Sequence, residues 1–114
     1  MKNKNALIIF AKNPVHGKVK TRLAKHIGND KAMNLYLKLL YNTYLKTKDM
    51  NCDKYLFLSD RKEIDLFGNN FKQIVQNGND IGERMKNAFD EVFKSGHSKI
   101  ILIGTDIPEL DEEI

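Results

Sequence analysis

Residues 7–23 read LIIFAKNPVHGKVKTRL, and this stretch decides the expected fold. It overlaps an apolar run, residues 6–10, that has the length of a strand and β-branched isoleucines at its centre. Such a run is typical of a strand covered on both faces, as in a parallel sheet. The chain then breaks into a loop over residues 11–21. Because open α/β folds bind ligands at the carboxyl ends of their central strands, this loop is the first candidate site.

The loop and the residue just beyond it carry four cations: Lys12, Lys18, Lys20 and Arg22. Cations at this place indicate an anionic ligand, and phosphate is the commonest kind. The loop is not a P-loop, because Pro14 and Val19 stand where that motif needs glycines. Side chains rather than a ring of backbone N–H groups would therefore supply the charge. The alternative is a solvated basic turn that binds nothing.

Length and composition bound the protein class. A chain of 114 residues predicts one domain over residues 1–114, able to bury roughly two-thirds of its unfolded surface. The balance of 19 basic against 15 acidic residues gives a net charge of +4. Since Lys and Arg are scattered rather than gathered in a tract, we expect no nucleic-acid partner. With one cysteine, Cys52, no signal peptide and no apolar run of membrane-spanning length, we expect a cytoplasmic protein without a membrane span.

Apolar patterning along the chain predicts alternating strands and helices. Strands are expected over residues 6–10, 54–58, 71–76 and 99–103, and helices over 21–26, 31–47, 61–67 and from Asp80 to a stop at Gly96. The apolar stripe of the 31–47 helix is wide, so we expect other parts of the protein to pack around much of the helix circumference. The βαβ alternation predicts an α/β fold whose sheet is parallel, with right-handed crossovers and loops gathered at one edge.

A second candidate loop, residues 104–108, follows the last predicted strand. If that strand lies beside the first, Asp106 faces the cations of the basic loop. An aspartate set between Gly104 and Pro108 suits Mg²⁺, which binds one or two carboxylates together with phosphate oxygens. A phosphate-bearing ligand would then bridge the two loops. The alternative is that Asp106 only caps the next turn.

A third candidate is the start of the helix after Asp80. Asp80 and Glu83 have the spacing of a capping box. Gly82 costs the first turn about 1 kcal/mol relative to alanine, which indicates that a ligand approaches the backbone there. Helix amino termini attract anions, so Gly82 and Arg84 are candidates for phosphate binding. The alternative is a plain cap in which Asp80 pairs with Arg84 four residues later.

Other polar and aromatic residues are expected to be structural. The histidines share no metal-ligand spacing and are expected on the surface or in loops: His16, His26 and His97. Three tyrosines at helical spacing are expected to pack in the core and at its rim: Tyr36, Tyr41 and Tyr44. The last residues, 110–114, have the pattern of an N-cap aspartate followed by an acidic first turn. Because no helix follows, we expect the chain to be the N-terminal part of something longer.

Three stretches together, FAKNPVHGKVKTRLAKHIG, GNDIGERMKNAF and ILIGTDIPEL, resemble a bacterial family of GT-A-like glycosyltransferases. That family includes transferases found beside radical-SAM and selenodomain genes. Its relatives include the phospholactate and molybdenum-cofactor guanylyltransferases. The resemblance runs along nearly the whole chain in the same order and spacing. It implies a Rossmann-like GT-A (nucleotide-diphospho-sugar transferase) fold with three layers and a mainly parallel sheet. Family members continue beyond this length, which again implies truncation at the C-terminus.

The resemblance also implies a function and a set of site residues. It implies a metal-dependent transferase that uses a nucleotide or nucleotide-sugar donor, glycosyltransferase-like, with Mg²⁺ or Mn²⁺. The residues that match the family's nucleotide-phosphate loop are Lys12, Gly17, Lys20, Thr21 and Arg22. Asp106 matches its metal-binding aspartate, and residues 82–84 match a motif without an assigned role. Two alternatives stay open: a guanylyltransferase-like nucleotidyltransferase, and a non-catalytic nucleotide-binding module.

Overall fold

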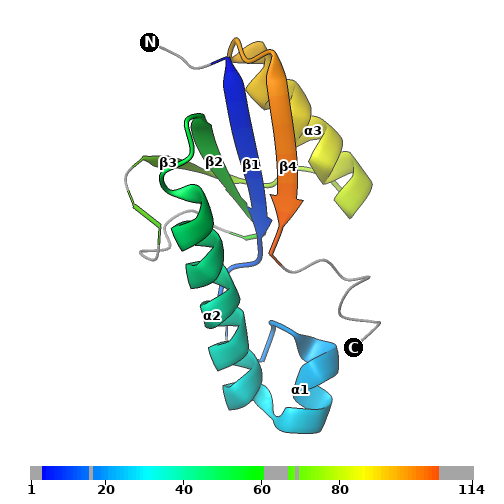
Figure 1. The fold of residues 1–114 in the computed structure, drawn as a ribbon. Helices are drawn as coiled ribbons and strands as arrows, with labels where there is room; N and C mark the ends of the chain where they lie inside the picture. The colour runs from blue at the N-terminus through cyan, green and yellow to red at the C-terminus, as the bar shows by residue number, and fades with distance from the viewer. Residues whose placement is uncertain (1–3, 16, 61–66, 69, 106–114) are drawn as a thin grey trace.

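The computed structural model describes residues 4–15, 17–60, 67–68 and 70–105, and it has the predicted α/β architecture (Figure 1). The elements follow in the order β1 (Asn5–Ala11), α1 (Thr21–Ile27), α2 (Asn29–Thr47), β2 (Asp53–Leu58), β3 (Phe71–Val75), α3 (Ile81–Lys94) and β4 (Lys99–Gly104). Each predicted strand is present to within one residue at either end. Of the short helix expected over residues 61–67, positions 61–66 lie outside the described residues.

The four strands form one parallel sheet in the order β3-β2-β1-β4. Ile8 at the centre of β1 pairs with Tyr55 of β2 on one side and with Leu102 of β4 on the other. The chain moves outward from β1 through β2 to β3 and then returns to the opposite side of β1. The strand order therefore reverses between β1 and β4, and such a switch point is where open α/β sheets bind ligands, outside the carboxyl ends of the strands.

Helices cover both faces of the sheet and make three layers (Figure 1). Alternate residues of β1 point to opposite faces, because the side-chain period of a strand is two. One set packs in the cluster that contains Tyr36 and Leu40 of α2: Leu7, Ile9 and Ala11. The other set packs in the cluster that contains Ala88 and Val92 of α3: Ala6, Ile8 and Phe10. The apolar run that was expected to be covered on both faces is covered in this way.

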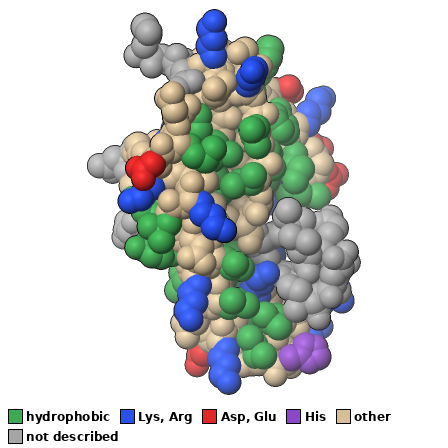
Figure 2. Space-filling view, in the orientation of Figure 1, with side chains coloured by type: hydrophobic (Ala, Val, Ile, Leu, Met, Phe, Trp, Pro, Cys, Tyr) green, Lys and Arg blue, Asp and Glu red, His purple; other side chains and the backbone are tan. Residues whose placement is uncertain are grey.

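Two details of α2 differ from the expectation. The helix begins at Asn29 with Gly28 as its N-cap, and Gly28, at φ +89°, also ends α1. Its apolar circumference is not covered: Leu37, Tyr41 and Leu45 are 37%, 48% and 42% exposed. These three follow one another at intervals of four residues, and hydrophobic side chains are visible at the surface of the molecule in the space-filling view (Figure 2). A single sheet face buries only one stripe of a helix, so the wider stripe stays at the surface.

His97 lies in the loop between α3 and β4, as expected of a loop histidine, but it is buried rather than exposed. Its Nε2 atom lies 2.6 Å from the hydroxyl of Tyr55 and 3.7 Å from a carboxylate oxygen of Asp53. Burial raises the pKa of the Tyr55 phenol, and the nearby Asp53 carboxylate adds to the rise. This cluster lies at the amino ends of the strands, at the opposite edge from the candidate loops.

Within the described part of the chain, no helix is both long enough and apolar enough to cross a membrane. The longest helix, α2, has 19 residues and carries charged side chains along its length.

Candidate functional site

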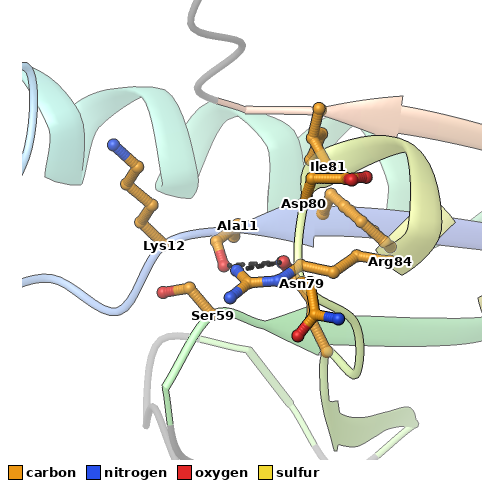
Figure 3. Close-up of a pocket in the computed structure, with 10 residues that line it drawn as sticks. Ala11, Lys12, Ser59, Asn79, Asp80, Ile81 and Arg84 are labelled. Carbon is orange, nitrogen blue, oxygen red and sulfur yellow. Dashed lines mark hydrogen bonds between the residues drawn. The ribbon is translucent and has the colours of Figure 1, made fainter.

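A pocket of about 310 Å³ opens at the carboxyl edge of the sheet. It receives residues from all four strand ends and from the start of α3 (Figure 3). The lining residues are Phe10, Ala11, Lys12, Ser59, Gln76, Asn79, Asp80, Ile81, Arg84 and Gly104. The pocket therefore lies where the topology predicts a ligand.

Two cations lie on opposite sides of the pocket (Figure 3). Lys12 is the first residue after β1, and Arg84 lies in the first turn of α3. The guanidinium of Arg84 extends from α3 toward Ala11 and Ser59. Because the amino terminus of α3 adds the positive end of a helix dipole, the pocket favours a ligand with negative charge.

The acidic residue in the lining, Asp80, is used as a helix cap. Its side chain accepts a 2.8 Å hydrogen bond from the N–H of Glu83, as the capping-box spacing predicts. The carboxylate of Glu83 reaches back to the N–H of Asn79 at 3.3 Å, one residue before the cap. Arg84 donates through Nε to the carbonyl oxygen of Gly78 at 3.1 Å instead of forming the i,i+4 pair with Asp80.

The loop after β3 packs tightly against the start of α3 at Gly78. This residue has φ +147°, and a Cβ there would lie 2.8 Å from the backbone nitrogen of Arg84. A side chain at this position would therefore push Arg84 away from the pocket edge. The close approach holds the first turn of α3 against the strand ends.

The basic loop after β1 is fastened to the end of β2 by Asn13. This residue is buried, its N–H donates to Ser59 Oγ at 3.1 Å, and its Oδ1 accepts from the N–H of Asp60 at 2.8 Å. Lys12 next to it is thereby held at the mouth of the pocket.

The other candidates in the basic loop lie apart from the pocket lining. Gly17 is exposed, with φ +83°, in a turn closed by the N–H of Lys18 bonding to the carbonyl oxygen of Val15. Thr21 and Arg22 are exposed at the start of α1. The predicted phosphate-binding cations thus form two groups. Lys12 and Arg84 line the pocket, whereas Lys20 and Arg22 lie at the start of α1, a place called here the α1 side of the carboxyl edge.

Lys20 has an unusual backbone. It is the N-cap of α1 and adopts left-handed angles, φ 49° and ψ 43°, although its side chain is buried. This conformation costs a residue with a Cβ roughly 1–2 kcal/mol. The surrounding contacts must offset that cost, and such residues cluster at binding sites.

Gly82 is exposed in the first turn of α3, between the pocket residues Ile81 and Arg84. Asp106 lies outside the described residues. The adjacency on which its expected role depends is present, since β4 pairs with β1 and the N–H of Thr105 donates to the carbonyl oxygen of Phe10 at 3.0 Å. Among the residues that the structure describes, no group of three His, Cys, Asp or Glu side chains gathers to hold a metal ion.

Sequence reasoning missed three polar residues of the pocket: Ser59, Gln76 and Asn79. Ser59 comes directly after a predicted strand, Gln76 is the last residue of another, and Asn79 follows three residues later. Polar residues at strand ends and in turns are common, and these three form no binding motif of their own. Since all strands of a parallel sheet end at the same edge, the positions after the strands were the available signal.

Comparisons with known proteins agree with this architecture. The model of a family described as "uncharacterized protein conserved in bacteria (DUF2064)" matches residues 44–114. A crystal structure from Desulfovibrio desulfuricans G20, of a protein provisionally described as a nucleotide-diphospho-sugar transferase, is 31% identical with a TM-score of 0.83. The match covers 99% of this chain and 53% of that one, so this chain spans about half its length. The GT-A-like fold predicted from sequence is confirmed. No curated protein matches the chain.

Proposed function

This chain belongs to the DUF2064 family, and on that premise we propose that it binds the nucleotide part of a nucleotide-sugar donor. It would do so as part of a metal-dependent, glycosyltransferase-like transferase. The description of the Desulfovibrio desulfuricans protein supports the sugar-nucleotide class of donor, since 99% of this chain matches that structure.

The observation that carries the proposal is the pocket at the carboxyl edge of the sheet. Lys12 and Arg84 line it from opposite sides, and the start of α3 contributes its dipole (Figure 3). Phe10, Ala11 and Ile81 give it apolar walls. A nucleoside diphosphate has both kinds of surface, with a charged diphosphate for the cations and a flat base for the apolar part.

In this proposal the cations bind phosphate oxygens through charge-assisted hydrogen bonds, which are about twice as strong as neutral ones. Lys12 and Arg84 act from the pocket, whereas Lys20, Thr21 and Arg22 act from the α1 side, with Gly17 shaping their loop. Gly82 leaves the backbone of the first turn of α3 open to a ligand. Mg²⁺ or Mn²⁺ would be held by Asp106 together with the phosphates of the donor, because hard divalent ions combine one or two carboxylates with phosphate oxygens.

Calorimetric titration tests the binding part of the proposal. A nucleoside diphosphate with Mg²⁺ should bind at least about tenfold more tightly than the matching nucleoside, because only the former engages the cations. Equal binding of the two, or no binding of the diphosphate, would overturn it.

Turnover by the intact gene product tests the reaction class. Release of a nucleoside diphosphate from a nucleotide-sugar indicates glycosyl transfer. Release of pyrophosphate from a nucleoside triphosphate indicates nucleotidyl transfer instead. Binding without either product indicates a non-catalytic nucleotide-binding module.

A further inference from the structure

The side chain of Gln76 connects three strand ends with α3. Gln76 is the first residue after β3, and its N–H donates to the carbonyl oxygen of Leu58 at 2.8 Å. Its amide Nε2 donates to the carbonyl oxygen of Phe57 at 2.9 Å and, at 3.5 Å, to that of Ala11. One side chain thus bonds to the ends of both β2 and β1.

These bonds fix which way the amide points. Since the two carbonyl groups can only accept, the NH₂ of Gln76 must face the strands and its Oε1 must face α3. On that side it accepts a long hydrogen bond, 3.5 Å, from Nη1 of Arg84. The acceptor for Arg84 is therefore set by the sheet and not by the helix that carries Arg84.

Arg84 is held by two acceptors on the loop after β3. Nε donates to the carbonyl oxygen of Gly78, and Nη1 donates to Gln76. A guanidinium has five N–H donors in a rigid plane. Fixing two of them fixes the direction of the others, and the guanidinium extends along the pocket toward Ala11 and Ser59.

We propose that Gln76 is a positioning residue for the diphosphate part of the pocket. It orients the guanidinium of Arg84 so that the donors not taken by the protein face the ligand's phosphate oxygens. This inference rests on the proposed nucleotide-binding function. In it Gln76 acts through Arg84, because its own amide N–H groups are used in hydrogen bonds to the strand ends. The residue type matters, because a carboxylate here would offset the charge of Arg84 and an apolar side chain would leave its orientation free.

A double-mutant cycle separates positioning from general support of the fold. We expect Gln76→Met and Arg84→Met each to weaken nucleoside diphosphate binding about tenfold, and the double variant to bind no more weakly than Arg84→Met. Binding of the matching uncharged nucleoside should stay unchanged. The matched control is Gln73→Met, the same substitution at the other glutamine, which lies within β3. Additive losses, or an equal loss of nucleoside binding, would overturn the proposal.

A ligand-free measurement keeps the inference separate from the proposed function. The side-chain Nη–H signals of Arg84 in ¹⁵N NMR spectra, which report on the bond from Nη1 to Gln76, should be slow to exchange with water in the wild-type chain and in Gln73→Met, and fast in Gln76→Met. Gln76→Glu retains an acceptor for Nη1 but adds a negative charge that offsets the charge of Arg84, so diphosphate affinity should fall. Nη–H signals that Gln76→Met leaves unchanged would exclude the positioning role. If the wild-type chain does not prefer the diphosphate over the nucleoside, the proposed function fails, and the NMR result alone decides whether Gln76 orients Arg84.

Discussion

The hydroxyl of Tyr36 donates a 2.7 Å hydrogen bond to the carbonyl oxygen of Lys12, the residue that begins the basic loop. The same hydroxyl lies 3.5 Å from Oγ1 of Thr105, which in turn donates to the carbonyl oxygen of Phe10 at 3.2 Å. A residue of α2 therefore ties the end of β1 to the end of β4 at the point where the strand order reverses. Tyr36 is fully buried, so its hydroxyl needs such partners.

Tyr36→Phe should destabilise the chain by about 1–3 kcal/mol, because it retains the ring and leaves the partly buried carbonyl oxygen of Lys12 without this donor. Urea unfolding followed by circular dichroism measures this. The control is Tyr41→Phe in the same helix, which removes an exposed hydroxyl and should change the free energy of unfolding by less than about 0.5 kcal/mol. Equal effects of the two substitutions would show that the contact with Lys12 contributes nothing.

Arg22→Ala tests whether the ligand reaches the α1 side of the carboxyl edge. If Arg22 binds phosphate, the substitution should weaken nucleoside diphosphate binding by roughly 1.5–3 kcal/mol. Stability should change little, because exposed charges contribute little to folding. Lys25→Ala removes an exposed cation from the same helix and serves as the control in calorimetric titration. Unchanged affinity in Arg22→Ala would place Arg22 outside the site.

Gly82→Ala distinguishes a ligand contact from a simple helix start. Alanine should stabilise the first turn of α3 by up to about 1 kcal/mol, since its Cβ would lie 3.4 Å from a carboxylate oxygen of Asp80, without a severe clash. If phosphate approaches the backbone here, the same substitution should weaken diphosphate binding. Thermal unfolding with and without ligand measures both effects. A more stable variant with unchanged affinity would leave Gly82 with no part in binding.

The periodic pattern of apolar residues predicted the strands and helices of this fold, because a buried face involves many residues and does not depend on any single contact. The apolar run of β1 and the 3.6-residue repeat of α3 each indicate a buried surface without naming a partner. The contacts that shape the pocket are different, because each depends on one distant residue. Tyr36 was correctly expected in the core, but its bond to Lys12 spans 24 positions. Gln76 follows a strand in a polar turn, and nothing local indicates that it reaches Phe57 and Arg84.

His97 shows the same limit. Its burial comes from Tyr55 and Asp53 on β2, which the topology brings beside the loop before β4. A single histidine between Gly96 and Ser98 carries no local sign of that neighbourhood. The exposed stripe of α2 is the opposite case. The spacing of its apolar residues predicted burial, but in the described part of the chain no element packs against that side of the helix.

Asp106→Asn tests the metal hypothesis. The substitution retains the shape of the side chain and its capacity to cap a turn, but it removes the charge. We expect it to abolish the enhancement of nucleoside diphosphate binding by Mn²⁺, with thermal stability in the absence of ligand within a few degrees of the wild type. Titrations with and without Mn²⁺ measure this. If Mn²⁺ still enhanced binding equally in the variant, Asp106 would not be a metal ligand, and a capping role would account for it.

The Tyr55 phenol makes stability depend on pH in the alkaline range. Burial, followed by the Asp53 carboxylate, raises the pKa of Tyr55 in the folded chain, and a hydrogen bond with Ser95 opposes the rise. In the unfolded chain a tyrosine loses its proton near pH 10. Above about pH 10 the folded state therefore binds more protons than the unfolded state, and the free energy of unfolding falls as pH rises.

Tyr55→Phe lacks this titration, so the stability difference between the wild-type chain and Tyr55→Phe should shrink from about pH 9 to about pH 11. Urea unfolding at several pH values in that range measures the difference, and titration of the lysines cancels between the two chains. Tyr41→Phe in the same assay is the control for the loss of an exposed phenol hydroxyl. A difference for Tyr55→Phe that stays constant over this pH range would mean that the buried cluster with His97 does not favour the protonated phenol.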